Sequence, residues 1–401
     1  MFENIEDAIK YIESKRNKHT VDEFRNILRE LGIHMKQKNM IHLAGTNGKG
    51  STVNYLRAIL NAHGYKVGTF TSPYLVCHND RICIDQTPIS DEDLLNYINK
   101  YYDAIEKNDL SMFEIDVLIM LDYFDSQDLD YRIIECGIGG LNDKTNVIDP
   151  IISAITNIGY DHFDQIGPTL YDVINEKMGV IKPNQLFITS ETSGTVLARL
   201  QEQCDVMGAK MIVVPEYEVY EYPYEFYYRY MNFVLKDQAA YQVPNARLAL
   251  TIASKLIDLD AAKTIKAVET AVWGGRYEKF NINNATVVID GAHNIPGIQA
   301  LVDTLKLEKR EEGAIVFSGL RDKEILQMID ILKQTGYQIF ATSFNDERGM
   351  NENEIKDKEI LKVKDYKNAI DLALQGYGFI VITGSLHFIS EVRKYLQKKS
   401  Q

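Results

Sequence analysis

Residues 41–52 carry an apolar run that passes into a glycine-rich turn closing on lysine and serine, with the sequence IHLAGTNGKGST. The apolar run is typical of a buried strand, and residues 53–63 after the turn have the pattern of a helix. A turn of this kind can aim several backbone N–H groups at a phosphate, and a helix N-terminus adds positive potential there. Lys49 would then reach the terminal phosphates, and Ser51 or Thr52 would face a metal ion.

The spacing of residues 45–52, here called the phosphate loop, differs from the general pattern G-x-x-x-x-G-K followed by Ser or Thr. The step from Gly45 to Gly48 is shorter than in that pattern, and Gly50 is inserted before Ser51. This difference favours a narrower variant over the common NTPase loop. A glycine-rich turn without a ligand is the alternative interpretation, and the strand before it and the helix after it count against that.

Three further segments follow predicted strands, which is where open α/β sheets place their ligands. They contain Ser72, Glu135 and His162. A hydroxyl, a carboxylate and an imidazole, together with phosphate oxygens, make a reasonable shell for Mg²⁺ or Mn²⁺. Each residue alone gives weak support, because a lone histidine after a strand more often caps an element or packs in a core. Together they gain weight, since a triphosphate needs a metal.

Two more candidate segments lie in the second half of the chain. Residues 273–276 (WGGR) hold the single tryptophan and place Arg276 near a domain boundary, from which a guanidinium can reach a phosphate. Residues 289–294 (IDGAHN) place Asp290 at a strand end, where it could accept from a ribose hydroxyl, although Asp-Gly alone can be only a turn. In the first half, Lys177 is either a solvated helical lysine or, beside a metal site, a source of charge.

Strand and helix signals alternate along the chain, which favours an α/β fold with a mostly parallel sheet covered by helices. Helical patterns cover 2–17, 21–31, 91–106 (with Ser90 as N-cap), 113–124, 169–180 and 245–256. Strand-like runs cover 66–71, 131–136, 151–158, 186–189 and 211–214, then 286–290, 314–318, 338–342 and 379–383. A boundary near residue 270 gives two domains, 1–270 and a smaller α/β domain at 271–401.

Residues 215–235 hold seven tyrosines in a Glu-rich setting. Their alternation predicts an antiparallel edge hairpin. A stacking platform for an aromatic ligand is conceivable, but a half-buried β ribbon is the favoured interpretation.

Composition excludes several classes of protein. The 401 residues include 44 basic and 57 acidic side chains, so the net charge of −13 argues against nonspecific nucleic-acid binding. No C-x-x-C pair occurs among the four cysteines, which leaves a zinc or redox motif with little support and fits a reducing cytoplasm. Residues 1–10 lack an apolar signal core, and no run approaches the length of a membrane span, so we expect no membrane partner.

Seven short motifs occur together and in order: GTNGKGS at 45–51, TSP at 71–73, ECGIGG at 135–140, EK at 176–177, WGGR at 273–276, DGAHN at 290–294 and TGSL at 383–386. This set resembles the folylpolyglutamate synthase and dihydrofolate synthase family, a branch of the Mur-type ATP-dependent amide ligases. The resemblance runs from about residue 1 to 395. The ordered set is highly specific, although no single motif is.

The resemblance implies an N-terminal P-loop-type ATPase domain and a smaller Rossmann-like C-terminal domain, with ATP between them and a monomer as the working form. It implies that the phosphate loop holds the phosphates and that Ser72, Glu135 and His162 hold Mg²⁺. It also implies that Lys177 is a candidate for carbamylation, which would turn a cation into an anionic oxygen ligand beside the metal. The remaining matches are Asn245, Arg276 and Asp290, as nucleotide contacts, and His293 and Ser385, near the incoming glutamate.

Three positions depart from the pattern of that family. Leu141, Asn142 and Asp143 stand where Arg-Leu-Asp is usual, which puts one polar contact in doubt. Residues 79–82 read NDRI in place of the more usual NERI, a mild change. Gly274 stands where proline is common.

The chemistry that the resemblance implies is amide formation in two steps. A substrate carboxylate attacks the γ-phosphate of ATP, and the amine of L-glutamate then displaces phosphate from the acyl phosphate. Lys49, Mg²⁺ and Arg276 would offset charge on the phosphoryl group, while His293 would orient the amine or accept its proton. The acid is either dihydropteroate, giving dihydrofolate, or a reduced folate, giving polyglutamates, and the sequence leaves both open.

Two other functions remain as alternatives. A Mur-type ligase of cell-wall synthesis would share the ATP machinery but normally carries an additional N-terminal substrate domain, and only about 40 residues precede the phosphate loop here. A catalytically silent, folate-binding relative is supported only by the departure at Leu141.

Overall fold

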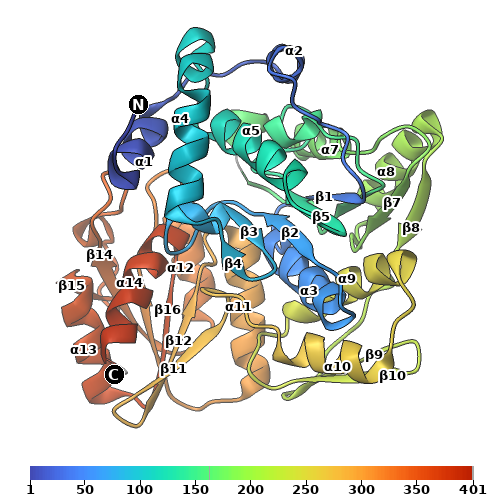
Figure 1. Cartoon of the computed structure of the whole chain (residues 1–401). Helices are drawn as coiled ribbons and strands as arrows, with labels where there is room; N and C mark the ends of the chain where they lie inside the picture. Colours follow the sequence, from blue (N-terminus) through green and yellow to red (C-terminus); the bar gives the residue numbers. More distant parts are fainter. Residues whose placement is uncertain (162, 400–401) are drawn as a thin grey trace. The chain divides into compact units, whose positions relative to one another are not determined.

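The computed structural model describes residues 1–161 and 163–399 and separates the chain into two compact units (Figure 1). The N-terminal unit comprises Met1–Glu216 and Asn245–Val268. The C-terminal unit comprises Tyr217–Pro244 and Glu269–Gln401. The tyrosine-rich segment therefore belongs to the C-terminal unit, although it precedes part of the N-terminal unit in sequence.

An eight-stranded sheet forms the centre of the N-terminal unit, in the order β4-β3-β2-β5-β1-β6-β7-β8. The six strands β2, β5, β1, β6, β7 and β8 run parallel to one another, whereas β3 and β4 add an antiparallel edge next to β2. The strands are β1 (Met40–Ala44), β2 (Val67–Phe70), β3 (Ile82–Ile84), β4 (Thr87–Pro88), β5 (Tyr131–Glu135), β6 (Ile152–Ile155), β7 (Leu186–Thr189) and β8 (Lys210–Val213). The predicted mostly parallel sheet is confirmed.

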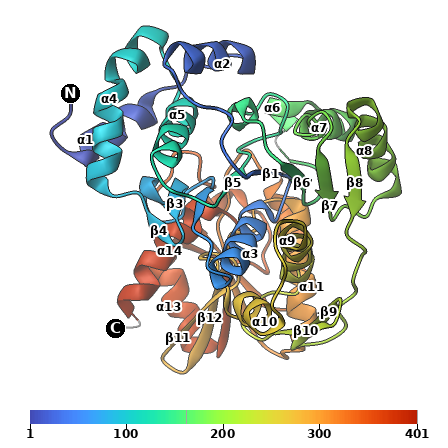
Figure 2. The same cartoon turned by 45° about the vertical axis from the view of Figure 1, so that its right-hand side comes forward.

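Helices surround this sheet (Figure 2). They are α1 (Ile5–Ser14), α2 (Val21–Glu30), α3 (Lys49–Ala62), α4 (Asp91–Asn108), α5 (Met112–Asp125), α6 (Phe163–Ile166), α7 (Leu170–Met178), α8 (Gly194–Met207), α9 (Gln242–Leu256) and α10 (Ala261–Thr270), with short 3₁₀ turns η1 (His78–Arg81) and η2 (Lys144–Val147). The predicted N-cap at Ser90 is confirmed, since its side chain accepts from the backbone N–H of Asp93 over 3.0 Å.

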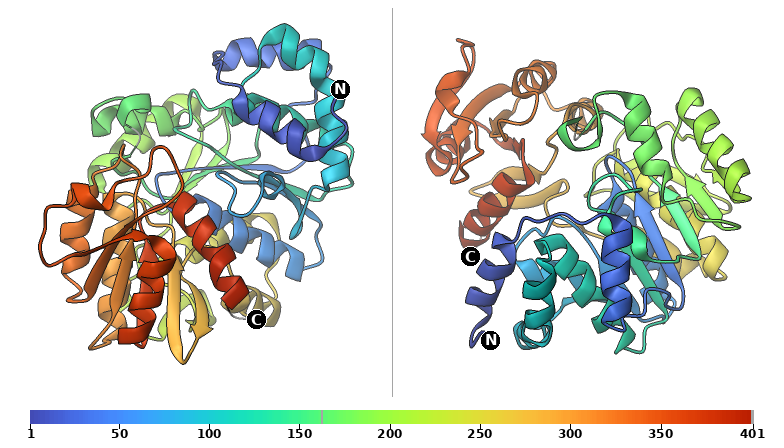
Figure 3. Two further views of the ribbon diagram at one scale, coloured as in Figure 1. Left: turned by 90° about the vertical axis from the view of Figure 1, so that its left-hand side faces the viewer. Right: turned by 90° about the horizontal axis from the view of Figure 1, so that it is seen from above.

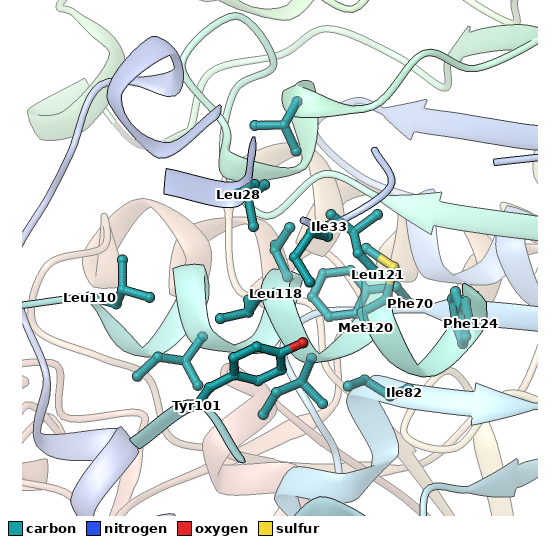
Figure 4. Packing of buried hydrophobic residues seen from close by; sticks show 14 of the residues in the cluster. Leu28, Ile33, Phe70, Ile82, Tyr101, Leu110, Leu118, Met120, Leu121 and Phe124 are labelled. Atoms are coloured by element: carbon teal, nitrogen blue, oxygen red, sulfur yellow. The ribbon is translucent and has the colours of Figure 1, made fainter. Parts of the chain in front are cut away.

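Both faces of the central strands are covered, because every residue of β1, β5 and β6 is buried. On one side, helices α2, α4 and α5 pack over β2 around Leu28, Phe70, Tyr101, Leu118 and Phe124 (Figure 4). This packing fixes the strands, and the carboxyl ends of the parallel strands then all emerge at one edge of the sheet.

The C-terminal unit has a six-stranded sheet in the order β11-β12-β16-β13-β14-β15 (Figure 3). Only β11 is antiparallel to its neighbour. The strands are β11 (Glu278–Ile282), β12 (Ala285–Asp290), β13 (Ala314–Phe317), β14 (Gln338–Ser343), β15 (Leu361–Asp365) and β16 (Phe379–Thr383), and the helices are α11 (Ile295–Glu308), α12 (Ile325–Lys333), α13 (Tyr366–Gly376) and α14 (Leu386–Lys399), with a 3₁₀ turn η3 (Glu352–Glu354). This is the second α/β domain that the sequence predicts.

The tyrosine-rich segment forms the predicted antiparallel hairpin, β9 (Tyr224–Tyr228) and β10 (Met231–Leu235). It is a separate two-stranded sheet rather than the edge of a larger one. Tyr224, Phe226 and Phe233 are buried, whereas Tyr227 and Tyr230 are exposed, so the segment is the half-buried ribbon that was the favoured interpretation.

No helix in the part of the chain that the structure describes is long and apolar enough to cross a membrane.

Candidate active site

The phosphate loop joins the end of β1 to the start of α3 and places Gly48 at the N-cap of that helix. Gly48 has a left-handed backbone with φ of 84°, a region that residues with a Cβ rarely adopt. Lys49 opens the helix, and the Thr52 hydroxyl donates to the Gly48 carbonyl oxygen over 2.9 Å. The loop therefore leads into the N-terminal turn of a 14-residue helix, where backbone N–H groups have no helical partner.

The end of β6 holds the phosphate loop in position. The backbone N–H groups of Thr46 and Asn47 donate to the carbonyl oxygen and to the side-chain Oδ1 of Asn157, over 2.9 and 3.0 Å. In return, the Thr156 hydroxyl donates to the Asn47 carbonyl oxygen over 2.6 Å. We predicted only His162 from this strand-end segment, so the bracing role of Thr156 and Asn157 was missed.

Two glycines of the phosphate loop are required by close packing. A Cβ at Gly45 would lie 1.9 Å from the Thr156 hydroxyl, and a Cβ at Gly48 would lie 2.1 Å from the Asn245 side-chain oxygen. Gly48 therefore lies against Asn245 of α9, and α9 lies beside α3 (Figure 2). The structure thus places Asn245 against the phosphate loop.

Two lysines approach the first residue of this loop. Lys49 Nζ donates to the carbonyl oxygens of Gly45 and Thr46 over 3.1 and 3.3 Å. Lys177, from α7, is only 4% exposed and donates from Nζ to the Gly45 carbonyl oxygen over 2.9 Å. Burial, followed by the nearby Lys49 ammonium, lowers the pKa of Lys177 to about 7. Lys177 is therefore a buried amine and not the solvated helical lysine of the alternative interpretation.

Ser72 and Glu135 are neighbours, because the Ser72 backbone N–H donates to Glu135 Oε2 over 3.2 Å. His162 lies outside the described residues. Within residues 1–161 and 163–399 no group of three His, Cys, Asp or Glu side chains could hold a metal by itself. One hydroxyl and one buried carboxylate do fit Mg²⁺, which uses few protein ligands and takes the rest from phosphate and water.

Leu141, where the family usually has arginine, is 51% exposed at the end of the glycine-rich segment after β5. Glu176 of α7 holds this segment through its carboxylate, which accepts from the backbone and side-chain N–H groups of Asn142 over 2.7 and 2.8 Å. The buried Asp143 accepts from the backbone N–H groups of Ile138 and Thr145, each over 2.9 Å. The loop therefore keeps its shape without the arginine.

In the C-terminal unit, the Asp290 carboxylate lies at the end of β12 and is only 2% exposed. One of its oxygens accepts from the Ala292 N–H over 2.9 Å, and the other accepts from the Tyr277 N–H over 2.9 Å and from the Tyr241 hydroxyl. Burial raises the pKa of Asp290, against the effect of Tyr241 and Arg276. Asp290 therefore fixes the turn around it, and its contact with a ribose stays a prediction.

Arg276, His293 and Ser385 lie around the carboxyl ends of β12 and β16. A Cβ at Gly291, directly after Asp290, would lie 2.3 Å from an Arg276 guanidinium nitrogen. His293 follows β12, and its Nδ1 donates to the Gly291 carbonyl oxygen over 2.9 Å, so Nε2 of the neutral ring is an acceptor. Ser385 follows β16, the parallel neighbour of β12, and its Oγ accepts from the His387 N–H at the start of α14 over 3.2 Å.

The predicted residues thus form two groups, each within one unit. On the N-terminal unit the structure brings together Gly45, Thr46, Asn47, Gly48, Lys49, Gly50, Ser51 and Thr52 with Lys177 and Asn245, and it pairs Ser72 with Glu135. On the C-terminal unit it brings together Arg276, Asp290, His293 and Ser385.

Comparison with known proteins assigns both units to one class. Residues 43–207 match the Mur ligase middle domain, and residues 275–386 match the Mur ligase glutamate ligase domain. Both units are therefore those of a Mur-type ligase.

The chain belongs to the dihydrofolate synthase/folylpolyglutamate synthase family. It is 30% identical to the dihydrofolate synthase/folylpolyglutamate synthase of Bacillus subtilis, over 99% of this chain and 100% of that protein. The solved apo form of the folylpolyglutamate synthase of L. casei is 26% identical with a TM-score of 0.85, covering 98% of this chain and 100% of that one. A folylpolyglutamate synthase in complex with AMPPCP and folate is 27% identical with a TM-score of 0.83, covering 98% and 99%.

Proposed function

We propose that this chain is an ATP-dependent ligase that joins L-glutamate to the carboxylate of a folate-type acid. Family membership over nearly the whole chain supports this reaction, as do relatives that are named for it and one solved with an ATP analogue and folate. The observation in this structure that carries the proposal is the convergence of two lysine side chains, from α3 and α7, on Gly45 of the phosphate loop. Of the two, Lys49 supplies the positive charge that stabilises a transferring phosphoryl group, whereas burial leaves Lys177 partly neutral.

ATP binds at the phosphate loop, where the N-terminal turn of α3 and its backbone N–H groups receive the phosphates. Lys49 neutralises charge on the terminal phosphates, and Asn245 lies against Gly48 of the same loop. Arg276 and Asp290 are the proposed nucleotide contacts of the C-terminal unit. Of these, Arg276 supplies a cation for a phosphate, and Asp290 shapes the turn after β12.

Mg²⁺ would be held by the Ser72 hydroxyl and the Glu135 carboxylate, with His162 as the third proposed ligand. When bound, the ion withdraws charge from the phosphate oxygens of ATP. Glu135 also accepts from the Ser72 backbone, which keeps the two side chains adjacent.

A carboxylate is a poor electrophile, and the first step therefore transfers the γ-phosphoryl group of ATP to the acid. The C–O bond of the resulting acyl phosphate then breaks when the amine of L-glutamate attacks the carbonyl carbon, and inorganic phosphate leaves. Lys49 offsets the negative charge in the first step. Holding the reactants in place and keeping water from the acyl phosphate are the other contributions of the protein.

His293 and Ser385 serve the incoming L-glutamate. The His293 ring donates from Nδ1 to Gly291, and Nε2 is the ring nitrogen that we assign to take a proton from the attacking amine. Lys177 is suited to carbamylation, because an amine whose pKa is about 7 is partly neutral at neutral pH and can add CO₂. The carbamate would convert this buried cation into an anionic group near the proposed metal ligands.

The acid is dihydropteroate, a reduced folate or both, and we propose a monomer that acts in the cytoplasm. Purified protein with Mg-ATP and L-glutamate should be offered dihydropteroate and tetrahydrofolate separately, with products identified by mass. A product heavier by one glutamate residue, formed with one ADP per bond, supports the proposal. ATP hydrolysis without such a product from either acid would contradict it.

A further inference from the structure

A buried histidine links three elements of the N-terminal unit. His78 lies in η1 and is 4% exposed. Its Nε2 lies 2.7 Å from Asp116 Oδ1 on α5, and its Nδ1 lies 3.1 Å from Glu13 Oε1 on α1.

The two contacts determine the protonation of the ring. Ionised carboxylates only accept hydrogen bonds, and a neutral imidazole has only one N–H to donate. With a carboxylate at each nitrogen, both nitrogens must carry hydrogen for both contacts to be hydrogen bonds. We propose that His78 is an imidazolium that clamps the segment 72–81 to α1 and α5, and that it is a positioning residue for Ser72.

The groups around His78 balance its charge. Arg81 lies beyond Asp116, with its Nε 3.5 Å from Oδ2, and its guanidinium carbon lies 5.3 Å from the centre of the Tyr74 ring. The Tyr74 hydroxyl donates to Glu13 Oε1 over 3.0 Å. Two cations therefore face two carboxylates. The Arg81 Nε and Asp116 Oδ2 atoms have no hydrogen-bond partner among the described residues, so His78 supplies the hydrogen bond that holds the buried Asp116.

The clamp acts on the segment that carries Ser72. The Thr71 N–H donates to the Arg81 carbonyl oxygen over 2.9 Å, which closes residues 71–81 into a loop at its base. Ser72 follows at once and donates to Glu135 over 3.2 Å. His78 holds the far side of the loop, because each of its ring nitrogens contacts a carboxylate on a different helix. Loss of this clamp would therefore loosen Ser72 without touching the phosphate loop.

The electrostatics agree with this geometry. Burial alone would lower the pKa of His78, but the Asp116 and Glu13 carboxylates outweigh burial and raise the pKa to about 9. The same contact lowers the pKa of Glu13, first through the His78 hydrogen bond. A group with a raised pKa stabilises the folded state fully below its unfolded value, about 6.5, and this contribution is lost as the pH rises through about 9.

The direct test is histidine NMR on the full chain labelled in its imidazole rings. We expect the His78 ring to remain an imidazolium at neutral pH and to titrate near pH 9. Glu13→Gln, at a side chain that is 34% exposed, should leave the fold intact and shift that titration to lower pH. A neutral His78 ring at pH 7 in the wild-type chain would overturn the proposal, whether or not the chain is a ligase.

A second test measures ligation activity and rests on the proposed function. His78→Gln should raise the Mg²⁺ concentration needed for half-maximal ligation by about tenfold, the lower end of what outer-shell partners of a metal site contribute, with little change in KM for ATP. His34→Gln, at a ring that is 71% exposed, is the matched control and should change neither value. An unchanged Mg²⁺ requirement in a folded, ligation-active His78→Gln chain would refute the positioning role.

Discussion

Lys49 and Lys177 donate hydrogen bonds to the same acceptor, the carbonyl oxygen of Gly45, over 3.1 and 2.9 Å. One lysine opens α3 and the other lies near the end of α7, so this relationship couples two residues that are 128 positions apart in sequence. The two ammonium groups repel each other, which contributes after burial to the lowered pKa of Lys177. The proposed chemistry rests on this difference between a charged Lys49 and a partly neutral Lys177.

Removal of Lys49 should abolish ligation while the chain stays folded. Lys49→Ala removes the cation that stabilises the transferring phosphoryl group, and we expect kcat to fall on the order of a hundredfold or more. Lys10→Ala, at a side chain that is 76% exposed in α1, is the control and should leave kcat unchanged. Steady-state ligation assays with circular dichroism check both variants. Near-wild-type kcat in Lys49→Ala would show that the phosphate loop has been assigned wrongly.

The low pKa of Lys177 should make stability depend on pH in a definite direction. The pKa is about 7 in the folded chain and 10.5 in the unfolded chain, so the unfolded state binds more protons between these values. Stability relative to Lys177→Met should therefore rise with pH over that window, by at most about 1.4 kcal/mol per pH unit. Denaturant unfolding in buffers free of CO₂ measures this difference, and a flat or falling difference would contradict the buried-amine assignment.

We also expect Lys177 to be carbamylated, which is a separate prediction. In bicarbonate buffer with ¹³C-labelled CO₂, the wild-type chain should show a carbamate carbon signal that Lys177→Met lacks. The expected reason is that a partly neutral amine adds CO₂ and releases a proton, whereas a charged lysine does not. A carbamate signal of equal size in both proteins would place the modification elsewhere.

Alanine variants of two glycines at opposite ends of α3 distinguish the effect of a steric clash from the effect of backbone conformation. Gly48 and Gly64 have φ of 84° and 91°, but only at Gly48 would a Cβ meet another atom within 4 Å. Both alanine variants should lose roughly 1 kcal/mol or more of stability, because alanine disfavours positive φ. Only Gly48→Ala should also lose activity, on the order of a hundredfold, since the Asn245 contact displaces the loop. Equal activities in the two variants would argue against a close-packed loop.

His293 should affect the second step of the reaction and not ATP binding. His293→Ala removes the Nε2 acceptor, and we expect kcat to fall about a hundredfold, with a higher KM for L-glutamate. The Kd for an ATP analogue, measured by calorimetry on the same variant, is the internal control and should be unchanged. Unaltered kcat and KM for L-glutamate would exclude His293 from the glutamate site.

Much of the fold could be predicted from the sequence, because its central strands are buried on both faces and are mostly apolar. The strands β1, β5 and β6 are of this kind. The edge strand β15, which is mostly exposed and holds three charged residues, gave no such signal and was missed. The short antiparallel edge of β3 and β4 was missed for a similar reason, since β4 has only two residues.

The candidate site was predictable where its chemistry lies in short, ordered motifs, as in the phosphate loop. The bracing contacts of Thr156 and Asn157 were not, because they arise when β6 is placed beside β1, and ordinary polar residues carry them. The clamp around His78 was missed because its partners, Glu13 and Asp116, are 65 and 38 residues away in sequence. Only the folded helices bring these charges together.

The most direct test of the central claim follows oxygen from the acid to phosphate. A folate-type acid whose carboxylate carries heavy oxygen should be ligated to L-glutamate with Mg-ATP, and the inorganic phosphate analysed by mass spectrometry. The account predicts that one heavy oxygen atom enters phosphate for each amide bond formed, because the acyl phosphate loses that oxygen with its leaving group. Amide formation with unlabelled phosphate would contradict it.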